Sequence, residues 1–196
     1  MSLESRIDLI GERIRVLAER LTERGYEFER PGEVFPGPDP ATTSAIASIE
    51  REAGKLPLAV KLFWLHVGSV DFRGSHPDWE TCPDVDFEGY PDPLVVFPPS
   101  VALAELNEFL EDKDERLRCG FPFVVPIAPD DMHKADVSGG MWYHVSIPAV
   151  ADDPPLNDEW HGTTFVNYLE IAVKWAGFPG LERLPGHTWP IASLVG

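Results

Sequence analysis

Residues 46–73 read IASIEREAGKLPLAVKLFWLHVGSVDFR, and they predict two short helices, an elbow between them and a strand after them. Ile46 and Ile49 recur at helical spacing, so the first helix has one apolar stripe. Gly54 can adopt the left-handed conformation that ends a helix. Pro57 then suits the first turn of the next helix, where its missing N–H group is no loss.

The second helix of this stretch is predicted to have a broad buried face, and Gly68 is predicted to end it. That face consists of Leu58, Leu62, Phe63 and Leu65. Residues 70–73 then alternate apolar and charged side chains, which is the period of a half-buried strand. The stretch contains no nucleophile, phosphate-binding loop or metal-ligand spacing, so it predicts packing rather than chemistry.

An Ile-x-x-Ile-Glu helix, a Gly-x-Leu-Pro elbow, an aromatic-rich helix, a glycine and a strand follow one another here. In this order they resemble the SUKH superfamily, which includes bacterial immunity proteins and a fungal regulator of cell-wall synthesis. The resemblance continues through residues 92–97, 123–130 and 164–168. It implies that the protein binds another protein, as an immunity protein that neutralises a toxin or as a regulatory scaffold.

The composition is that of a globular protein that stays out of the membrane. The 196 residues are 43% hydrophobic and 25% charged, which suits a single domain over residues 1–196. No apolar run approaches the roughly 20 residues of a membrane helix, and charges interrupt the N-terminus where a signal peptide would be apolar. Cys82 and Cys119 lack a Cys-x-x-Cys partner, as is usual for free thiols. We therefore expect a cytoplasmic protein.

The net charge of −17 is the strongest signal in the composition. It argues against nucleic acid, whose phosphates need a positive surface, and against anionic membranes. Residues 71–92 carry seven acids and one base, so much of the charge is concentrated there. Such a field favours a basic protein partner, although acidity can also serve solubility alone.

The remaining elements predict an α+β fold. Residues 5–24 form an amphipathic helix with Ser5 and Asp8 as a capping box, and this helix is expected to pack onto the domain. Further predictions are strands over 94–97 and 121–128, a helix over 100–111 capped by Ser100, a hairpin over 134–147 turning at 138–140, and a helix capped by Thr164. This order predicts a mostly antiparallel central sheet with helices packed on one face.

Three groups of side chains resemble metal sites, and each has a simpler interpretation. Residues 84–89 begin like a calcium loop, but its twelfth position is Val95 instead of a glutamate. His76, Asp78, Glu80 and Cys82 alternate, but two prolines interrupt the extended conformation that would align them. His133 lies near Asp130 and Asp131, in a turn where aspartates commonly bond the backbone. We therefore predict no metal, no cofactor and no catalytic residue.

The favoured hypothesis is a non-enzymatic binding protein whose acidic and aromatic loops block the active site of a basic toxin domain. The residues predicted to bind this partner are Asp78, Trp79, Glu80, Asp84, Asp86, Glu88, Asp130, Asp131 and Trp142. Two alternatives stay open at this point. One is a small hydrolase or metal-dependent enzyme that uses the carboxylates and histidines of the same loops, and the other is a regulatory interaction scaffold.

Overall fold

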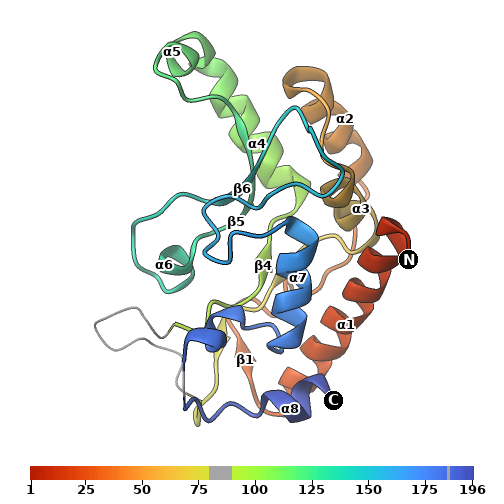
Figure 1. The fold of residues 1–196 in the computed structure, drawn as a ribbon, viewed down its shortest axis with the longest axis vertical. Coiled ribbons are helices and arrows are strands. Elements are labelled where there is room, and N and C mark those ends of the chain that lie inside the picture. Colours follow the sequence, from red (N-terminus) through yellow and green to blue (C-terminus); the bar gives the residue numbers. More distant parts are fainter. Residues whose placement is uncertain (80–89, 185) are drawn as a thin grey trace.

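The computed structural model describes residues 1–79, 90–184 and 186–196, and these form an α+β fold (Figure 1). The helices are α1 (Leu3–Glu23), α2 (Thr42–Ala53), α3 (Leu58–His66), α4 (Pro99–Glu111), α5 (Lys113–Arg118), α6 (Asp131–Lys134), α7 (Phe165–Lys174), the 3-10 helix η1 (Pro179–Arg183) and α8 (Ile191–Val195). The strands are β1 (Glu27–Phe28), β2 (Val70–Asp71), β3 (Gly74–Ser75), β4 (Val95–Val96), β5 (Val124–Ala128) and β6 (Tyr143–Ser146). The predicted α+β class is confirmed.

The strands pair antiparallel throughout the described residues, as β1 with β3, β2 with β4 and β5 with β6. The Phe97 N–H group donates a 2.7 Å hydrogen bond to the Ile127 carbonyl, which joins the β2–β4 pair to the β5–β6 pair. The register of β5 on β6 shifts between Pro126 and Ala128, because Pro126 has no N–H group to donate to the ladder. The described strands therefore form three short antiparallel pairs, two of which are linked through the Phe97–Ile127 hydrogen bond.

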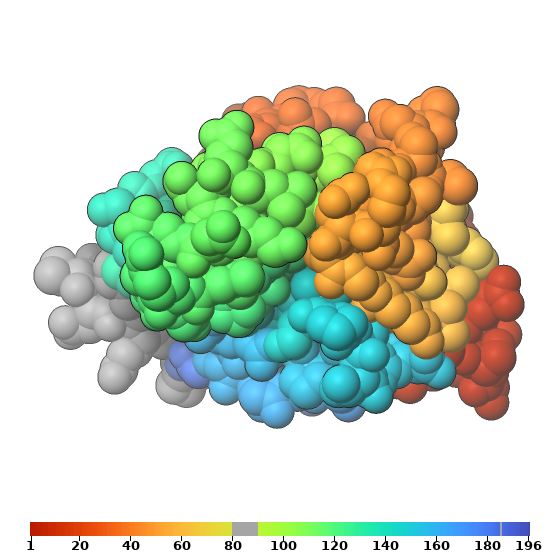
Figure 2. All heavy atoms as spheres, turned by 90° about the horizontal axis from the view of Figure 1, so that it is seen from above, coloured from red at the N-terminus to blue at the C-terminus, as the bar shows by residue number. Residues whose placement is uncertain are grey.

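The elbow between α2 and α3 is held by one carboxylate. Gly54 ends α2 with φ 102°, and α3 begins directly after Pro57. Glu50 Oε1 accepts hydrogen bonds from the Leu56 backbone at 3.0 Å and from Lys61 Nζ at 2.9 Å. The two helices are thereby fixed at the angle that sets α2 against α4 and α3 against α1. Figure 2 shows α2 (orange) and α4 (green) side by side on the upper face.

The predicted buried face of α3 is partly wrong. The buried residues are Ala59, Val60, Phe63 and Trp64, whereas Leu58 and Leu62 are half-buried and Leu65 is exposed. Trp64 enters the core because its Nε1–H group donates to the Phe97 carbonyl at 2.9 Å, which satisfies its polar atom. The helix is apolar on most sides, so its sequence alone does not determine which side faces inward.

Two predicted caps are wrong and one is confirmed. Ser2 caps α1 by accepting from the Ser5 backbone at 3.1 Å, so the helix begins earlier than its predicted capping box. Helix α4 begins at a proline and has no side-chain cap, which places Ser100 inside the helix. Thr164 caps α7 by accepting from the Asn167 backbone, as the sequence predicts.

The predicted hairpin over residues 134–147 is wrong. Asp130 Oδ1 accepts from the His133 backbone at 2.7 Å, which starts the short helix α6, and residues 134–137 form no strand although one was expected there. Strand β6 pairs instead with β5, with Val145 opposite Val125. Ser138, Gly139 and Gly140 therefore lie in a connecting segment and not in a hairpin turn.

One continuous core cluster runs from Ile7 in α1 to Leu194 in α8. Helix α1 lies along α3 and α7 (Figure 1). Helix α1 approaches the end of α3 closely at Gly11, where an added Cβ atom would lie 2.8 Å from Val67 Cγ2.

In the part of the chain that is described, no helix has both the length and the apolar character needed to cross a membrane.

We expect Glu50→Ala to lower the free energy of unfolding by about 1–3 kcal/mol, because the Leu56 N–H group loses its acceptor and Lys61 loses its partner. Hydrogen bonding to Lys61 holds the pKa of Glu50 below its ordinary 4.5. The stabilisation is therefore complete above that pH and is lost as the pH falls through the folded pKa. Urea unfolding at several pH values measures both effects.

Glu52→Ala is the matched control, because Glu52 lies in the same turn and pairs only with the neighbouring Arg51 among the described contacts. We expect it to change stability by less than about 0.5 kcal/mol. Equal stability of the two variants would show that the elbow does not depend on the carboxylate of Glu50.

Candidate protein-docking groove

A groove of about 500 Å³ lies between α4, the segment that follows α5, and the start of β6. We call it the apolar groove, and its main lining residues are Glu105, Phe109, Phe121, Phe123, Met141 and Trp142. Phe121 and Met141 expose 69% and 51% of their surface, and Trp142 is also exposed. Neighbouring exposed apolar side chains of this size mark interaction surfaces more often than isolated ones do.

Phe121 is exposed because of the backbone on either side of it. Gly120 has φ 83° and turns the chain at the end of α5, and the Phe121 N–H group donates to the Arg116 carbonyl at 2.9 Å. Pro122 follows and has no N–H group for a strand ladder. Strand β5 consequently starts at Val124, not at residue 121 as predicted, and the Phe121 ring stays outside the sheet.

Trp142 is held from two sides. Its ring makes an edge contact with Phe97 at a centroid distance of 5.3 Å, and it lies parallel to the His133 ring at 6.4 Å. Next to it, His144 Nδ1 lies 3.0 Å from the Trp142 carbonyl and 3.1 Å from Asp158 Oδ2. A partner that binds Trp142 would therefore meet a side chain whose position is already fixed.

The rim of the apolar groove is mainly acidic. Glu105 lines it, and Glu108 lies at its edge, 3.2 Å from the lining Arg116. Arg116 also lies over the Phe109 ring at 5.9 Å. Two glutamates and one arginine thus lie around the aromatic floor.

Two residues predicted to bind a partner have other roles. Asp130 is buried, and its Oδ1 atom bonds both the backbone and Nδ1 of His133. Gly140 covers the carboxylate so closely that an added Cβ atom would lie 1.7 Å from Asp130 Oδ2. The prediction that Asp130 faces a partner is therefore wrong, because this side chain caps α6. Asp131 is half-buried and accepts from the Met132 backbone at 2.9 Å.

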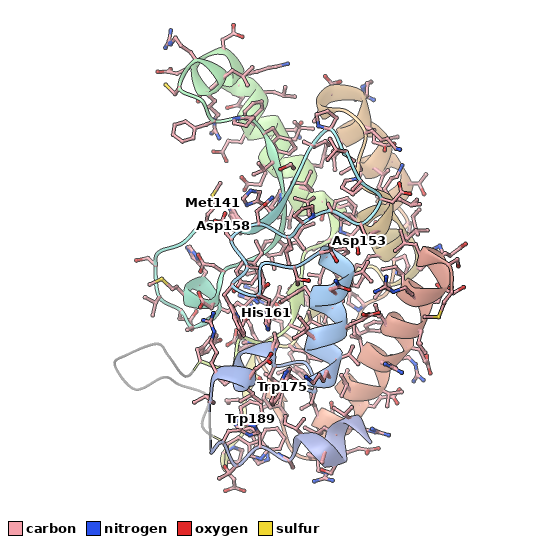
Figure 3. The ribbon with its side chains drawn as sticks, viewed as in Figure 1. Met141, Asp153, Asp158, His161, Trp175 and Trp189 are labelled. Carbon is pink, nitrogen blue, oxygen red and sulfur yellow. The ribbon has the colours of Figure 1, made fainter. Side chains whose placement is uncertain are left out.

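Trp79 lies in a different part of the molecule. It is half-buried, stacks on His76 at 4.1 Å and packs against Trp189 at 4.9 Å. Trp189 lies at the lower end of the molecule in Figure 3, far from Met141. Asp78 is exposed beside Trp79. Among the described residues, Trp79 and Trp142 therefore do not form one patch.

The other predicted binding residues, Glu80, Asp84, Asp86 and Glu88, lie outside the described residues, as do Cys82 and the calcium-like segment 84–89. Their roles stay predictions. Of the candidate metal groups, His76 bonds the Arg24 carbonyl and His133 bonds Asp130. Within the described ranges, no three His, Cys, Asp or Glu side chains are placed to share a metal ion.

Behind Trp142 the structure buries an ion pair that sequence reasoning missed. Lys134 Nζ lies 2.6 Å from Asp92 Oδ1, and both side chains are almost fully buried. The Lys134 ammonium also lies 4.7 Å from the centre of the Tyr143 ring, and Tyr90 donates to the Lys134 carbonyl at 2.6 Å. Burial raises the pKa of Asp92, and Lys134 opposes that shift. Asp92 and Lys134 are 42 residues apart in the chain, so no local spacing in the sequence signals this pair.

A second buried carboxylate orients a histidine nearby. Glu159 bonds both the backbone and Nδ1 of His161, whose ring stacks on Trp160 at 3.5 Å. Burial is the main cause that raises the pKa of Tyr143 and Tyr168, and the carboxylates of Asp92 and Glu159 add to that shift. Neither buried carboxylate is part of the lining of the apolar groove.

Comparison of the chain with protein-family models, with curated proteins and with solved structures finds no match. The geometry of the apolar groove therefore carries the functional argument.

We expect Lys134→Met to lower the free energy of unfolding by about 3–5 kcal/mol, because it leaves a buried carboxylate without its counter-charge. In this variant the folded pKa of Asp92 stays above its ordinary 3.8, so the folded state holds its proton more tightly than the unfolded chain. The variant should therefore lose stability as the pH rises above about 3.8. Denaturant unfolding across pH measures the slope.

The double variant Lys134→Met with Asp92→Asn should recover part of the loss and remove the slope, because no buried charge remains. Asn is suitable because Asp92 has φ 50°, which Asn tolerates better than most residues. Lys174→Met, at an exposed lysine, is the control. A single variant Lys134→Met as stable as this control would contradict a structural role for the pair.

Proposed function

We propose that this protein binds a basic protein partner through the apolar groove, and that it acts as an immunity protein by covering the active site of a toxin. The observation that supports the proposal is the set of exposed side chains Phe121, Met141 and Trp142 around one groove of an acidic protein. Aromatic residues and methionine are enriched at the centres of protein interfaces, where a few side chains supply most of the binding energy.

The arrangement of the groove favours protein over small-molecule binding. The Phe121 side chain projects from the surface, so it can insert into a pocket of the partner. Trp142 is held against Phe97 and His133, which lowers the entropy lost when it is buried in an interface. A rigid ring beside flexible apolar side chains is a common composition for an interface centre.

The net charge supports a basic partner. A charge of −17 attracts a positive surface over a distance of about one Debye length, roughly 8–10 Å at physiological salt. Acidic side chains at the rim, such as Glu105 and Glu108, would then face basic residues around the apolar contact. Charge of this kind mainly raises the association rate.

The resemblance of residues 46–73 to the SUKH superfamily supports the immunity role, because that family includes bacterial immunity proteins. Steric blockade needs no catalytic group on the blocking protein, only a surface that fits the toxin better than the substrate does. A regulatory scaffold would use the same groove on a different partner. The gene next to this one discriminates the two, because an immunity gene is expected beside a toxin gene.

The test is to co-express the protein with the product of the adjacent gene and to measure affinity and toxin activity. We expect the double variant Phe121→Ser with Met141→Ser to weaken binding at least about 30-fold, as loss of a hot spot of about 2 kcal/mol would, and to release toxin activity. Raising the salt concentration should slow association of the wild-type pair.

Val150→Ser is the matched control, because Val150 exposes 98% of its surface and lies outside the lining of the apolar groove. It should leave affinity within about twofold, which is less than 0.5 kcal/mol. Unchanged binding of the groove variant would contradict the assigned surface. A toxin that stays active in a stable complex would contradict the immunity role.

A further inference from the structure

We infer that the apolar groove takes a short amphipathic helix of the partner, whose apolar stripe sits in the groove and whose flanks carry lysine or arginine. The inference rests on the proposed function and specifies the part of the partner that is bound. Three features support it: the blocked strand edges beside the groove, the apolar floor between two walls, and the acidic rim.

The strands beside the groove have little free edge for pairing with another strand. Pro122 and Pro126 lack N–H groups, so the start of β5 cannot form a regular ladder with an added strand. The Ile127 carbonyl already accepts from Phe97. On the outer side of β6, His144 and Asn157 exchange backbone hydrogen bonds of 3.2 and 2.8 Å. Recognition here must therefore use side chains more than backbone.

The floor and walls suit a helix that presents a row of apolar side chains. Phe109 and Phe123 pack together at 5.6 Å on the floor. Helix α4 forms one wall, and Met141 with Trp142 forms the other. A partner helix places anchors at i, i+3 or i+4, and i+7 on one side, and all its backbone groups are bonded internally. It can thus fill an apolar groove without leaving polar backbone groups unpaired.

The rim determines the charge of the occupant. Glu105 has no ion pair among the described residues. Glu108 forms an ion pair with Arg116, which itself lines the groove. Helix α4 has no basic residue in its last turn, so the negative end of its dipole is not compensated within the helix. Basic residues on both flanks of the apolar stripe would meet this rim, whereas acidic flanks would be repelled.

Three synthetic peptides of about 14 residues, or four helical turns, test the inference with the full chain. The first is an amphipathic helix of leucine and lysine, the second replaces every lysine by glutamate, and the third has the composition of the first in an order without a helical stripe. Binding is followed by nitrogen-edited NMR, which also locates the contact. We expect the first peptide to bind at least about tenfold more tightly than either of the others, a difference of about 1.4 kcal/mol.

Protein variants separate the groove from general attraction between a basic peptide and an acidic protein. Phe121→Ser with Met141→Ser should weaken the leucine–lysine peptide at least about tenfold at unchanged net charge. Glu105→Gln with Glu108→Gln should weaken it and flatten its salt dependence. Glu4→Gln with Glu23→Gln removes the same charge from exposed positions on α1 and should leave affinity within about twofold.

If the peptide without a stripe bound as tightly as the amphipathic peptide, the inference that the groove takes a helix would be wrong. Failure of the amphipathic peptide to bind would contradict it as well. If the rim variant and the α1 variant weakened peptide binding equally, the role given to Glu105 and Glu108 in recognition would be wrong. These outcomes do not decide the proposed function. That proposal fails if the adjacent gene product binds without Phe121 and Met141, or if it stays active as a toxin in the complex. The inference fails alone if that product binds the groove through a segment that is not a basic helix.

Discussion

The backbone polar groups of residues 94–97 lie in and beside the buried strand β4, and most of the fold depends on how their hydrogen bonds are satisfied. The Leu94 N–H group donates to Gly177 and its carbonyl accepts from Phe72. The Phe97 N–H group donates to Ile127 and its carbonyl accepts from the Trp64 indole. A buried peptide group without a partner is costly, so these bonds tie β2, α3, β5 and the end of α7 to one short segment.

The same segment connects the interior to the surface. Phe97 supports the Trp142 ring, and its backbone fixes β5. On the inner side, the Lys134–Asp92 pair holds α6 and the residues before β4 together at the base of this region. A groove whose walls are anchored in this way keeps its shape before a partner arrives, which reduces the entropy lost on binding.

Part of this architecture could be predicted from local chemistry. Gly54 and Pro57 give the elbow, Thr164 gives a cap, and Pro126 gives an irregular strand, because each residue restricts its own backbone. Helix α6 and the inward side of α3 could not be predicted in this way. Asp130 serves a helix instead of a surface only because Gly140 covers it, and Trp64 is buried only because a carbonyl 33 residues away accepts its N–H group.

In the apolar groove, too, some features could be predicted from the local sequence and others depend on distant contacts. Trp142 could be found from the sequence as an aromatic beside polar residues, but its neighbours in the groove could not. Phe121 reads as the first residue of a buried strand, and it is exposed because Gly120 and Pro122 both prevent it from joining the sheet. An apolar residue that its own backbone excludes from the core has no packing role to explain its presence. Its position beside Met141 and an acidic rim suits it to binding a partner. The function is therefore assigned to this surface and not to the buried carboxylates.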